Sequence, residues 1–122
     1  MSKLTIGICV YDDYDGAFFT LQSLRMYHSE VMDRVEFVVI NNNPASEHGK
    51  ALKNIVDTIT EPKTYLEYTK YSSPFIKGKI FDIAETEYVL VMDSHVLLEP
   101  GSLKKLLDYW RERVNESILP ND

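Results

Sequence analysis

The sequence contains a single cysteine, Cys9, and this scarcity excludes a disulfide framework within the chain. A chain without disulfides suits a reducing compartment, so we expect a cytoplasmic protein. No apolar run approaches the roughly 18 residues that a transmembrane helix requires, and the residues after Met1 lack the pattern of a signal peptide. Met1 and the polar last residues suit a complete chain. Cys9 lies within an apolar run, so we interpret it as a small buried side chain and not as a nucleophile.

Positive charge is scarce as well. The sequence has 13 lysine and arginine residues against 19 aspartate and glutamate residues, and its net charge is −6. Binders of nucleic acids or anionic membranes need a basic face, so we expect neither class. The same acidity makes a phosphate ligand hard to hold unless a divalent cation supplies positive charge. With 122 residues, 44% of them hydrophobic and 26% charged, the chain has the size and composition of one globular domain.

Apolar runs alternate with amphipathic segments along the chain. Short runs rich in β-branched and aromatic residues predict strands at 4–10, 35–40, 64–68 and 88–92. Apolar residues at helical spacing predict helices at 17–28, 46–60, 76–84 and 102–114, followed by a flexible tail at 115–122. This alternation predicts a single domain over residues 1–122, with a three-layer α/β/α fold. Its sheet should have about four strands, mainly parallel, joined by right-handed crossovers.

Polar side chains follow each expected strand, whereas the strands themselves are almost purely apolar. The polar segments are 11–13, 41–43, 69–73 and 93–95. Because the carboxyl ends of parallel strands meet at one edge of the sheet, we expect a ligand site at that edge.

The triplet Asp93-Ser94-His95 follows the last expected strand directly. A carboxylate oxygen and an imidazole nitrogen two residues apart suit Mn²⁺ or another borderline divalent ion better than Ca²⁺. The alternative is that Asp93 caps a turn and His95 is a surface residue that makes hydrogen bonds. For the remaining candidates we expect structural roles. Asp13 and Asp15 suit a turn and a helix cap, and His28 and His48 suit the surface.

In this order, the segments resemble the nucleotide-sugar-binding half of a GT-A-fold (Rossmann-like) glycosyltransferase over nearly the whole chain. Residues 5–12 resemble the opening strand and Tyr-Asn loop of the large inverting family, and 36–43 resemble its second strand. Residues 76–78 take the place of an Ala-Arg-Asn stretch, and 85–95 resemble a Gly-Glu-Tyr, apolar strand and Asp-x-Asp metal motif. The Asp-Ser-His form is similar to the Mn²⁺-binding variant in polypeptide N-acetylgalactosaminyltransferases.

The resemblance implies a metal-dependent transferase of the hexosyltransferase type, with a nucleotide-sugar donor, expected to be UDP-linked, and an unknown acceptor. It implies that Asp93 and His95 bind Mn²⁺ or Mg²⁺. The residues that it implies for nucleotide-sugar binding are Val10, Tyr11, Asp12, Asn42, Lys77, Asp93 and Ser94. Tyr11 would contact the base, Asp12 and Asn42 the base and ribose edges, and Ser94 the ribose. The plainer alternatives are a packing role for Tyr11 and a solvated helix position for Lys77.

The chain also departs from the family. Asn41 and Asn42 replace the acidic pair that usually contacts uracil, so the nucleotide stays open. The family's second half, with its acceptor site, usual general base and third metal ligand, has no counterpart in the sequence, and we assign no catalytic base. A homo-oligomer or a partner chain would supply the missing half. The first alternative is an inert nucleotide-sugar-binding module. The second is a two-component receiver domain, suggested by Asp12 and Asp13, although Asp57 falls in a helical pattern and a fifth strand is missing.

Overall fold

Strands and helices alternate along the chain as the sequence pattern predicts. The structure is a computed structural model, and it describes residues 3–69 and 73–118. The elements in order are β1 (Leu4–Val10), α1 (Tyr14–Tyr27), the 3₁₀ helix η1 (Ser29–Arg34), β2 (Val35–Asn41), α2 (Glu47–Asp57), β3 (Lys63–Glu67), α3 (Ser73–Ile83), β4 (Tyr88–Met92) and α4 (Ser102–Ile118).

The four strands form one parallel sheet in the order β3-β2-β1-β4. β1 pairs with β2 from Leu4↔Val35 onward and with β4 from Leu4↔Tyr88 onward. The chain therefore builds the sheet outward from β1 through β2 to β3, and then returns to the other side of β1 for β4. This reversal is the topological switch point of a Rossmann-like sheet, and it lies between the carboxyl ends of β1 and β4.

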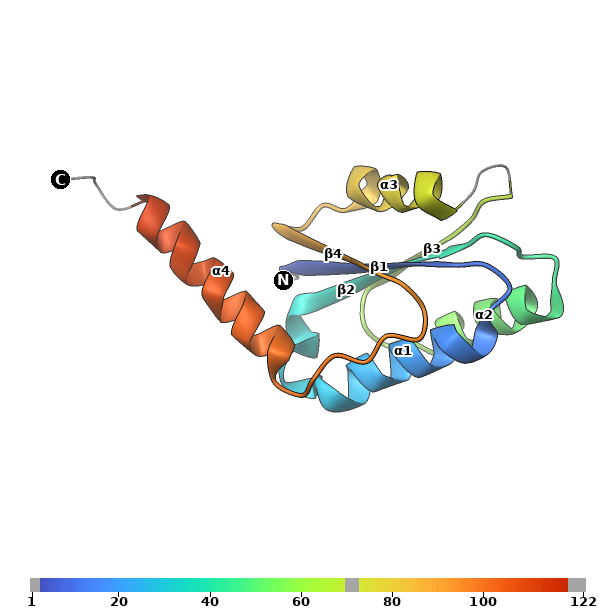
Figure 1. Cartoon of the computed structure of the whole chain (residues 1–122), viewed down its shortest axis with the longest axis horizontal. Coiled ribbons are helices and arrows are strands. Elements are labelled where there is room, and N and C mark those ends of the chain that lie inside the picture. The colour runs from blue at the N-terminus through green and yellow to red at the C-terminus, as the bar shows by residue number, and fades with distance from the viewer. Residues whose placement is uncertain (1–2, 70–72, 119–122) are drawn as a thin grey trace.

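Helices cover both faces of the sheet. In Figure 1, α3 lies on one face, α1 and α2 lie on the other, and α4 extends away from the body. Every residue of β1 is buried, which explains why this strand is apolar in the sequence apart from Thr5. A Cβ on Gly7 would overlap the side chain of Ile80, so this glycine lets α3 pack closely against β1. The predicted α/β/α fold with a parallel sheet is confirmed.

The strand order also bears on the receiver hypothesis. A flavodoxin-like sheet of the receiver type places its first strand between the second and the third. Here β1 lies between β2 and β4. Asp57 is the last, exposed residue of α2 and not a strand-end residue. We therefore set the receiver hypothesis aside.

Several boundaries differ from the sequence-based expectation. α1 begins at Tyr14 and α3 at Ser73, three residues earlier than predicted in each case, whereas residues 70–72 lie outside the described part. η1 was not predicted, because its six residues are too few to show a helical period. α4 continues to Ile118, past the point where we expected a tail to begin, and 119–122 lie outside the described residues. Across the described part of the chain, no helix is both long and apolar enough to span a membrane.

Candidate functional site

The loop after β1 is shaped by two aspartates. Asp12 has a φ of 50°, a left-handed conformation that Asp tolerates better than most residues. Asp13 is the N-cap of α1, and its Oδ1 accepts a hydrogen bond from the Gly16 backbone N–H at 3.1 Å. The cap therefore lies at Asp13, where we expected a turn residue, and Asp15 lies in the first turn, one of the two positions that its place in the sequence allowed. The turn thus brings a carboxylate to the edge between β1 and β4.

His95 lies against that carboxylate. Its Nε2 is 2.9 Å from Asp13 Oδ2, and its backbone N–H donates to the Gly16 carbonyl at 3.4 Å. His95 itself has a φ of 63°, so the loop after β4 turns sharply at this residue. A Cβ on Gly16 would overlap both the Asp13 carboxylate and the His95 ring. The contact between the two loops therefore depends on a residue without a side chain at position 16.

Asp93 has a different partner, Lys77 on α3. The Lys77 Nζ lies 2.5 Å from Asp93 Oδ1, and the Asp93 side chain is 68% exposed. Solvent screens a pair with this exposure, so its contribution to stability is small. The structure thus brings together two of the predicted nucleotide-binding residues.

Cys9 is buried, as expected, and burial is the main cause that raises the pKa of its thiol to about 11.

The predicted metal ligands Asp93 and His95 follow one strand but contact different partners. Among residues 3–69 and 73–118, no group of three or more His, Cys, Asp or Glu side chains is placed to hold a metal ion. The donor chemistry nevertheless fits a divalent cation. Both side chains are about two-thirds exposed, at 68% for Asp93 and 67% for His95. Sites for Mg²⁺-type ions commonly combine one or two protein ligands with the phosphate oxygens of a substrate.

The side chains of the first two of the three consecutive asparagines have structural partners. Asn41 is fully buried, and its amide donates to the Gly49 carbonyl at 2.8 Å and to the Tyr65 hydroxyl at 2.9 Å. Asn42 is 5% exposed and donates to the Tyr68 carbonyl at 2.7 Å. These hydrogen bonds explain why amide side chains occur at positions 41 and 42. The predicted nucleotide contact of Asn42 stays a prediction.

The other predicted nucleotide contacts lie near the same edge with different exposure. Tyr11 is 62% exposed, so its ring does not pack in the core. Asp12 is exposed and Ser94 is half-buried. Val10 is buried, and its carbonyl accepts a hydrogen bond from the Asn42 backbone N–H at 2.8 Å. Tyr11 and Asp12 are therefore the groups after β1 that solvent, and so a ligand, can reach.

The segment that follows His95 is attached along α1. The Val96 backbone N–H donates to Thr20 Oγ1 at 3.1 Å, and the Leu98 carbonyl lies 3.1 Å from His28 Nε2. His28 is 1% exposed, so its predicted surface position is wrong, whereas His48 is exposed as expected. The partner of His28 is distant in the sequence, and local sequence pattern carries no signal for such a contact. These bonds fix the direction in which the chain leaves the site.

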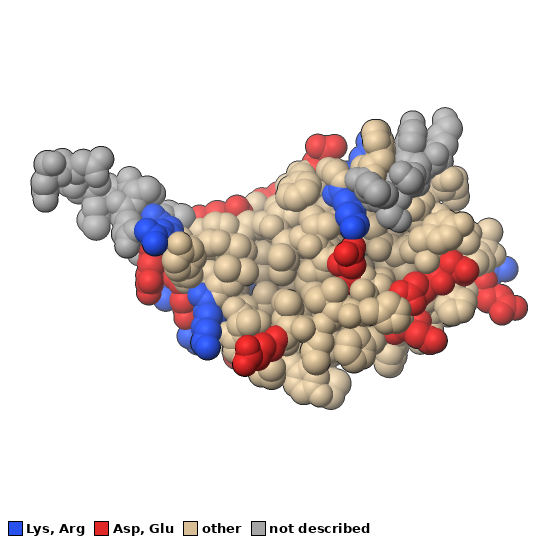
Figure 2. Space-filling view, in the orientation of Figure 1, with Lys and Arg blue, Asp and Glu red and all other residues tan. Residues whose placement is uncertain are grey.

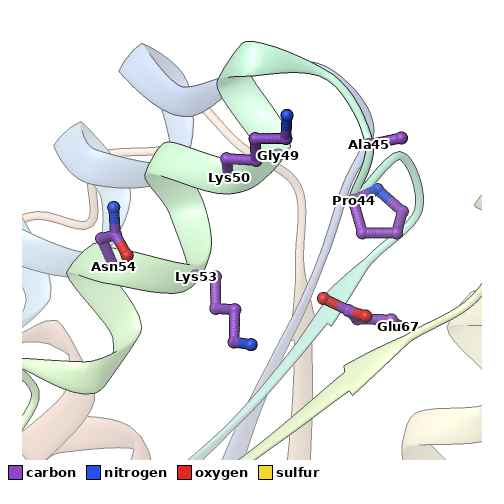
Figure 3. Close-up of a pocket in the computed structure, with 7 residues that line it drawn as sticks. All are labelled: Pro44, Ala45, Gly49, Lys50, Lys53, Asn54 and Glu67. Carbon is purple, nitrogen blue, oxygen red and sulfur yellow. The ribbon is translucent and has the colours of Figure 1, made fainter.

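A hollow of about 460 Å³ lies between α2 and β3, at the end of the sheet opposite β4. Figure 3 shows the residues that line it. Its lining residues are Pro44, Ala45, Gly49, Lys50, Lys53, Asn54 and Glu67. Lys50 and Lys53 come from one side of α2, and Glu67 ends β3. Lysines on an exposed helix face carry no distinctive pattern, so this hollow could not be predicted from the sequence.

No protein-family model and no curated protein matches this chain. The function must therefore be inferred from the geometry of the site itself.

Proposed function

We propose that the chain binds a nucleotide sugar at the edge between β1 and β4 and, as a metal-dependent glycosyltransferase, transfers the sugar to an acceptor. One observation carries this proposal. The strand order reverses between β1 and β4, and the pairs Asp13–His95 and Lys77–Asp93 both lie at the ends of these strands. Open α/β sheets bind their ligands at such a reversal.

The contact between Asp13 and His95 supports a metal-binding role for the imidazole. Histidines that ligate metals usually donate their other ring N–H to a carboxylate, which fixes the orientation of the ring. Asp13 contacts His95 through Nε2, so Nδ1 is the nitrogen left for a cation. In the proposal, His95 Nδ1 and the Asp93 carboxylate hold Mn²⁺ or Mg²⁺. When bound, the ion neutralises the diphosphate and the charge that develops on the leaving nucleotide.

The remaining residues have roles that follow from their exposure. Lys77 contacts Asp93 in this structure, and an ammonium group released from that contact can bind a phosphate oxygen as a point charge. The exposed Tyr11 ring offers a stacking surface for a base, and Asp12 offers a carboxylate to base or ribose hydroxyls. We propose a UDP-linked donor. The buried, unpaired Cys9 supports a cytoplasmic location.

Calorimetry with UDP-sugars in the presence and absence of Mn²⁺ tests binding. We expect Mn²⁺-dependent binding that Asp93→Ala weakens at least tenfold, because the variant loses one of two protein ligands of the ion. Asp57→Asn is the matched control, since it removes an exposed carboxylate at the end of α2, and it should bind as the wild type does. Equal binding with and without Mn²⁺, or no binding at all, would contradict the proposal.

A binding module without transfer is the alternative, and one observation favours it. The Asp13 carboxylate contacts His95, and the Asp93 carboxylate contacts Lys77. Neither carboxylate is therefore available as a general base for an acceptor. An assay for UDP release and sugar transfer separates the two functions. Turnover that His95→Ala abolishes would exclude the inert module. Binding without turnover, across a panel of acceptors, would exclude the transferase.

A further inference from the structure

β4 forms an open edge of the described sheet. Its only neighbour in the strand order is β1. The Tyr88 backbone N–H donates to the Lys3 carbonyl, on the β1 side. The backbone N–H and C=O groups of successive residues in a strand point to alternate sides. Those of Leu90 and Met92 therefore also point toward β1, whereas those of Val89 and Val91 point outward.

This edge lacks the features that normally prevent pairing. Proteins protect edge strands with charged side chains, proline or bulges. The opposite edge strand, β3, has such protection, since it begins at Lys63 directly after Pro62 and ends at Glu67. β4 reads Tyr-Val-Leu-Val-Met and contains no charge, no proline and no glycine. β3 therefore has the protection of an edge strand that stays unpaired, whereas β4 has the sequence of an edge strand that pairs with another strand.

The side chains of β4 are also more exposed to solvent than is usual for a strand in a parallel sheet. Residues 88–91 are half-buried, whereas all seven residues of β1 are buried. Parallel strands normally have both faces covered. Figure 2 shows a broad surface with few charged groups in the region where Figure 1 shows β4 and the segment after it. Such a surface suits contact with another protein surface.

We propose that β4 pairs with β4 of a second copy of this chain, antiparallel and about a two-fold axis between the two Leu90 residues. The axis places Val89 opposite Val91 of the second copy, and the outward N–H and C=O groups of each such pair can exchange two hydrogen bonds. The pairing joins two four-stranded sheets into one.

A second copy fits better than a different partner because the strand is self-complementary on both faces. Val89 and Val91 pack with the α3-side cluster, and Tyr88, Leu90 and Met92 pack with the α1-side cluster. A two-fold axis perpendicular to the sheet keeps each face on its own side, so apolar residues meet apolar residues throughout.

The charges that flank the strand are also compatible with this register. It brings Glu87 near Asp93 of the second copy, which would be unfavourable for two bare carboxylates. Glu87 is paired with Lys3 at 3.4 Å, and Asp93 is paired with Lys77 at 2.5 Å. Each carboxylate therefore brings its own ammonium group. This compensation holds for the unliganded chain, in which Lys77 contacts Asp93, and the pairing gives the expected homo-oligomer a defined interface.

Cross-linking tests the register directly. Directly opposed residues without hydrogen bonds between them have Cα atoms about 4.5 Å apart, within the range of a disulfide. Leu90→Cys should therefore form a covalent dimer under mild oxidation on a non-reducing gel. Thr64→Cys on β3 is the matched control and should stay monomeric. The native Cys9 is buried and should not contribute.

A proline substitution tests the hydrogen bonds. The Val89 N–H faces outward, so Val89→Pro removes no bond between β1 and β4, yet it removes a donor at the interface. We expect the wild type to sediment as a dimer and Val89→Pro as a folded monomer, with folding checked by circular dichroism. If this variant fails to fold, the cross-linking result decides. A monomeric wild type, or a dimer in which Leu90→Cys cross-links no faster than Thr64→Cys, would overturn the proposal.

Discussion

Asp13 shows how one side chain at the site serves two elements. Its carboxylate accepts the Gly16 N–H at the start of α1 and also contacts the His95 ring after β4. The sequence pattern predicted an acidic helix start but indicated Asp15 for the cap or first turn, whereas the cap is Asp13. The contact with His95 could not be predicted, because it depends on how β4 returns to β1. Gly16 was the sequence feature that could have indicated this contact, since a glycine in the first turn of a helix often permits another segment to approach closely.

Substitutions at Asp13 should separate these two roles. Asparagine caps helices about as well as aspartate, so Asp13→Asn should retain stability while it removes the charge opposite His95. Asp13→Ala should lower the free energy of unfolding by about 0.5–2 kcal/mol because the cap is lost. Urea denaturation of both variants measures the difference. Equal destabilisation by the two substitutions would show that the charge, and not the cap, provides the stability.

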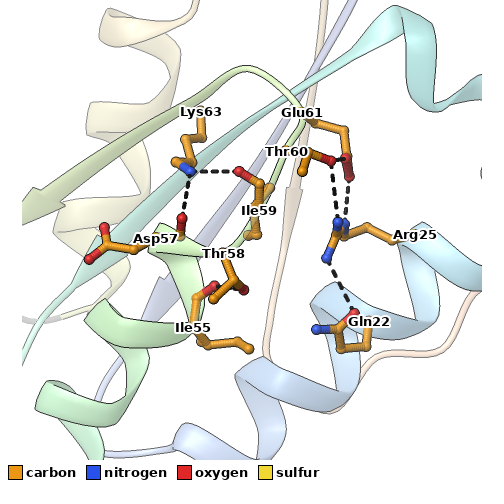
Figure 4. A network of polar contacts seen from close by, with 9 residues as sticks. All are labelled: Gln22, Arg25, Ile55, Asp57, Thr58, Ile59, Thr60, Glu61 and Lys63. Atoms are coloured by element: carbon orange, nitrogen blue, oxygen red, sulfur yellow. Dashed lines mark hydrogen bonds and ion pairs between the residues drawn. The ribbon is translucent and has the colours of Figure 1, made fainter.

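At the level of elements, polar contacts attach the ends of helices to the sheet. The Nε of Arg25, on α1, lies 2.5 Å from Oε1 of Glu61, which precedes β3, and Figure 4 shows this contact and its neighbours. The Thr60 hydroxyl donates to the other Glu61 oxygen at 2.9 Å. The Lys63 ammonium donates to the Ile59 carbonyl, just beyond α2, at 2.6 Å. It also donates to the carbonyl of Asp57, the last residue of α2, at 3.3 Å. Burial alone would raise the pKa of Glu61, but hydrogen bonds from Arg25 and Thr60 outweigh it and lower the pKa.

This lowered pKa predicts a loss of stability in acid. Glu61 binds protons less readily in the folded than in the unfolded state, so its contribution is complete above the unfolded pKa. It is lost as the pH falls through the folded pKa. At pH 7, Glu61→Gln should cost about 1–3 kcal/mol and should reduce the further loss between pH 5 and pH 3. Urea midpoints across this range measure the effect. The exposed Glu85→Gln is the control, and the hypothesis fails if both variants follow the wild-type pH curve.

The elements themselves were predicted to different degrees. Strong apolar runs such as 4–10 and 88–92 gave strands whose bounds match the structure. β3 was predicted one residue late, since its pattern of half-exposed residues is weaker. The starts of α1 and α3 were each predicted three residues late, because the apolar spacing was counted from Ala17 and Ile76. η1 could not be found by periodicity, because a single 3₁₀ segment shows no repeat.

At the level of the whole molecule, β1 is the centre of the sheet and carries the single cysteine. The alternation of runs was enough to predict the layers, because strands buried on both faces read as continuous apolar segments. It did not predict the strand order, which depends on which face each crossover helix covers. Asn41 and Asn42 show the same limit, since their partners Gly49, Tyr65 and Tyr68 lie in other segments of the chain.

Cys9 should report the opening of the whole sheet. Its side chain is 7% exposed, and burial raises the pKa of its thiol to about 11, so little reactive thiolate exists in the folded protein at neutral pH. Labelling of Cys9 by a thiol reagent should therefore follow global unfolding and accelerate with urea in parallel with the unfolding transition. Thr64→Cys, at an exposed position of β3, should label at once. Rapid native-state labelling of Cys9 would show that β1 opens locally.

The position of β1 between β2 and β4 also matters while the polypeptide is being made. Leu4 pairs with Val35 on one side and with Tyr88 on the other. Once β1 has left the ribosome, its β4-side flank therefore stays open until translation has passed Met92. Nascent chains that are shorter than this display an unsatisfied apolar strand, which is the kind of segment that chaperones bind. The sheet is thus completed only after β2 and β3 have been made.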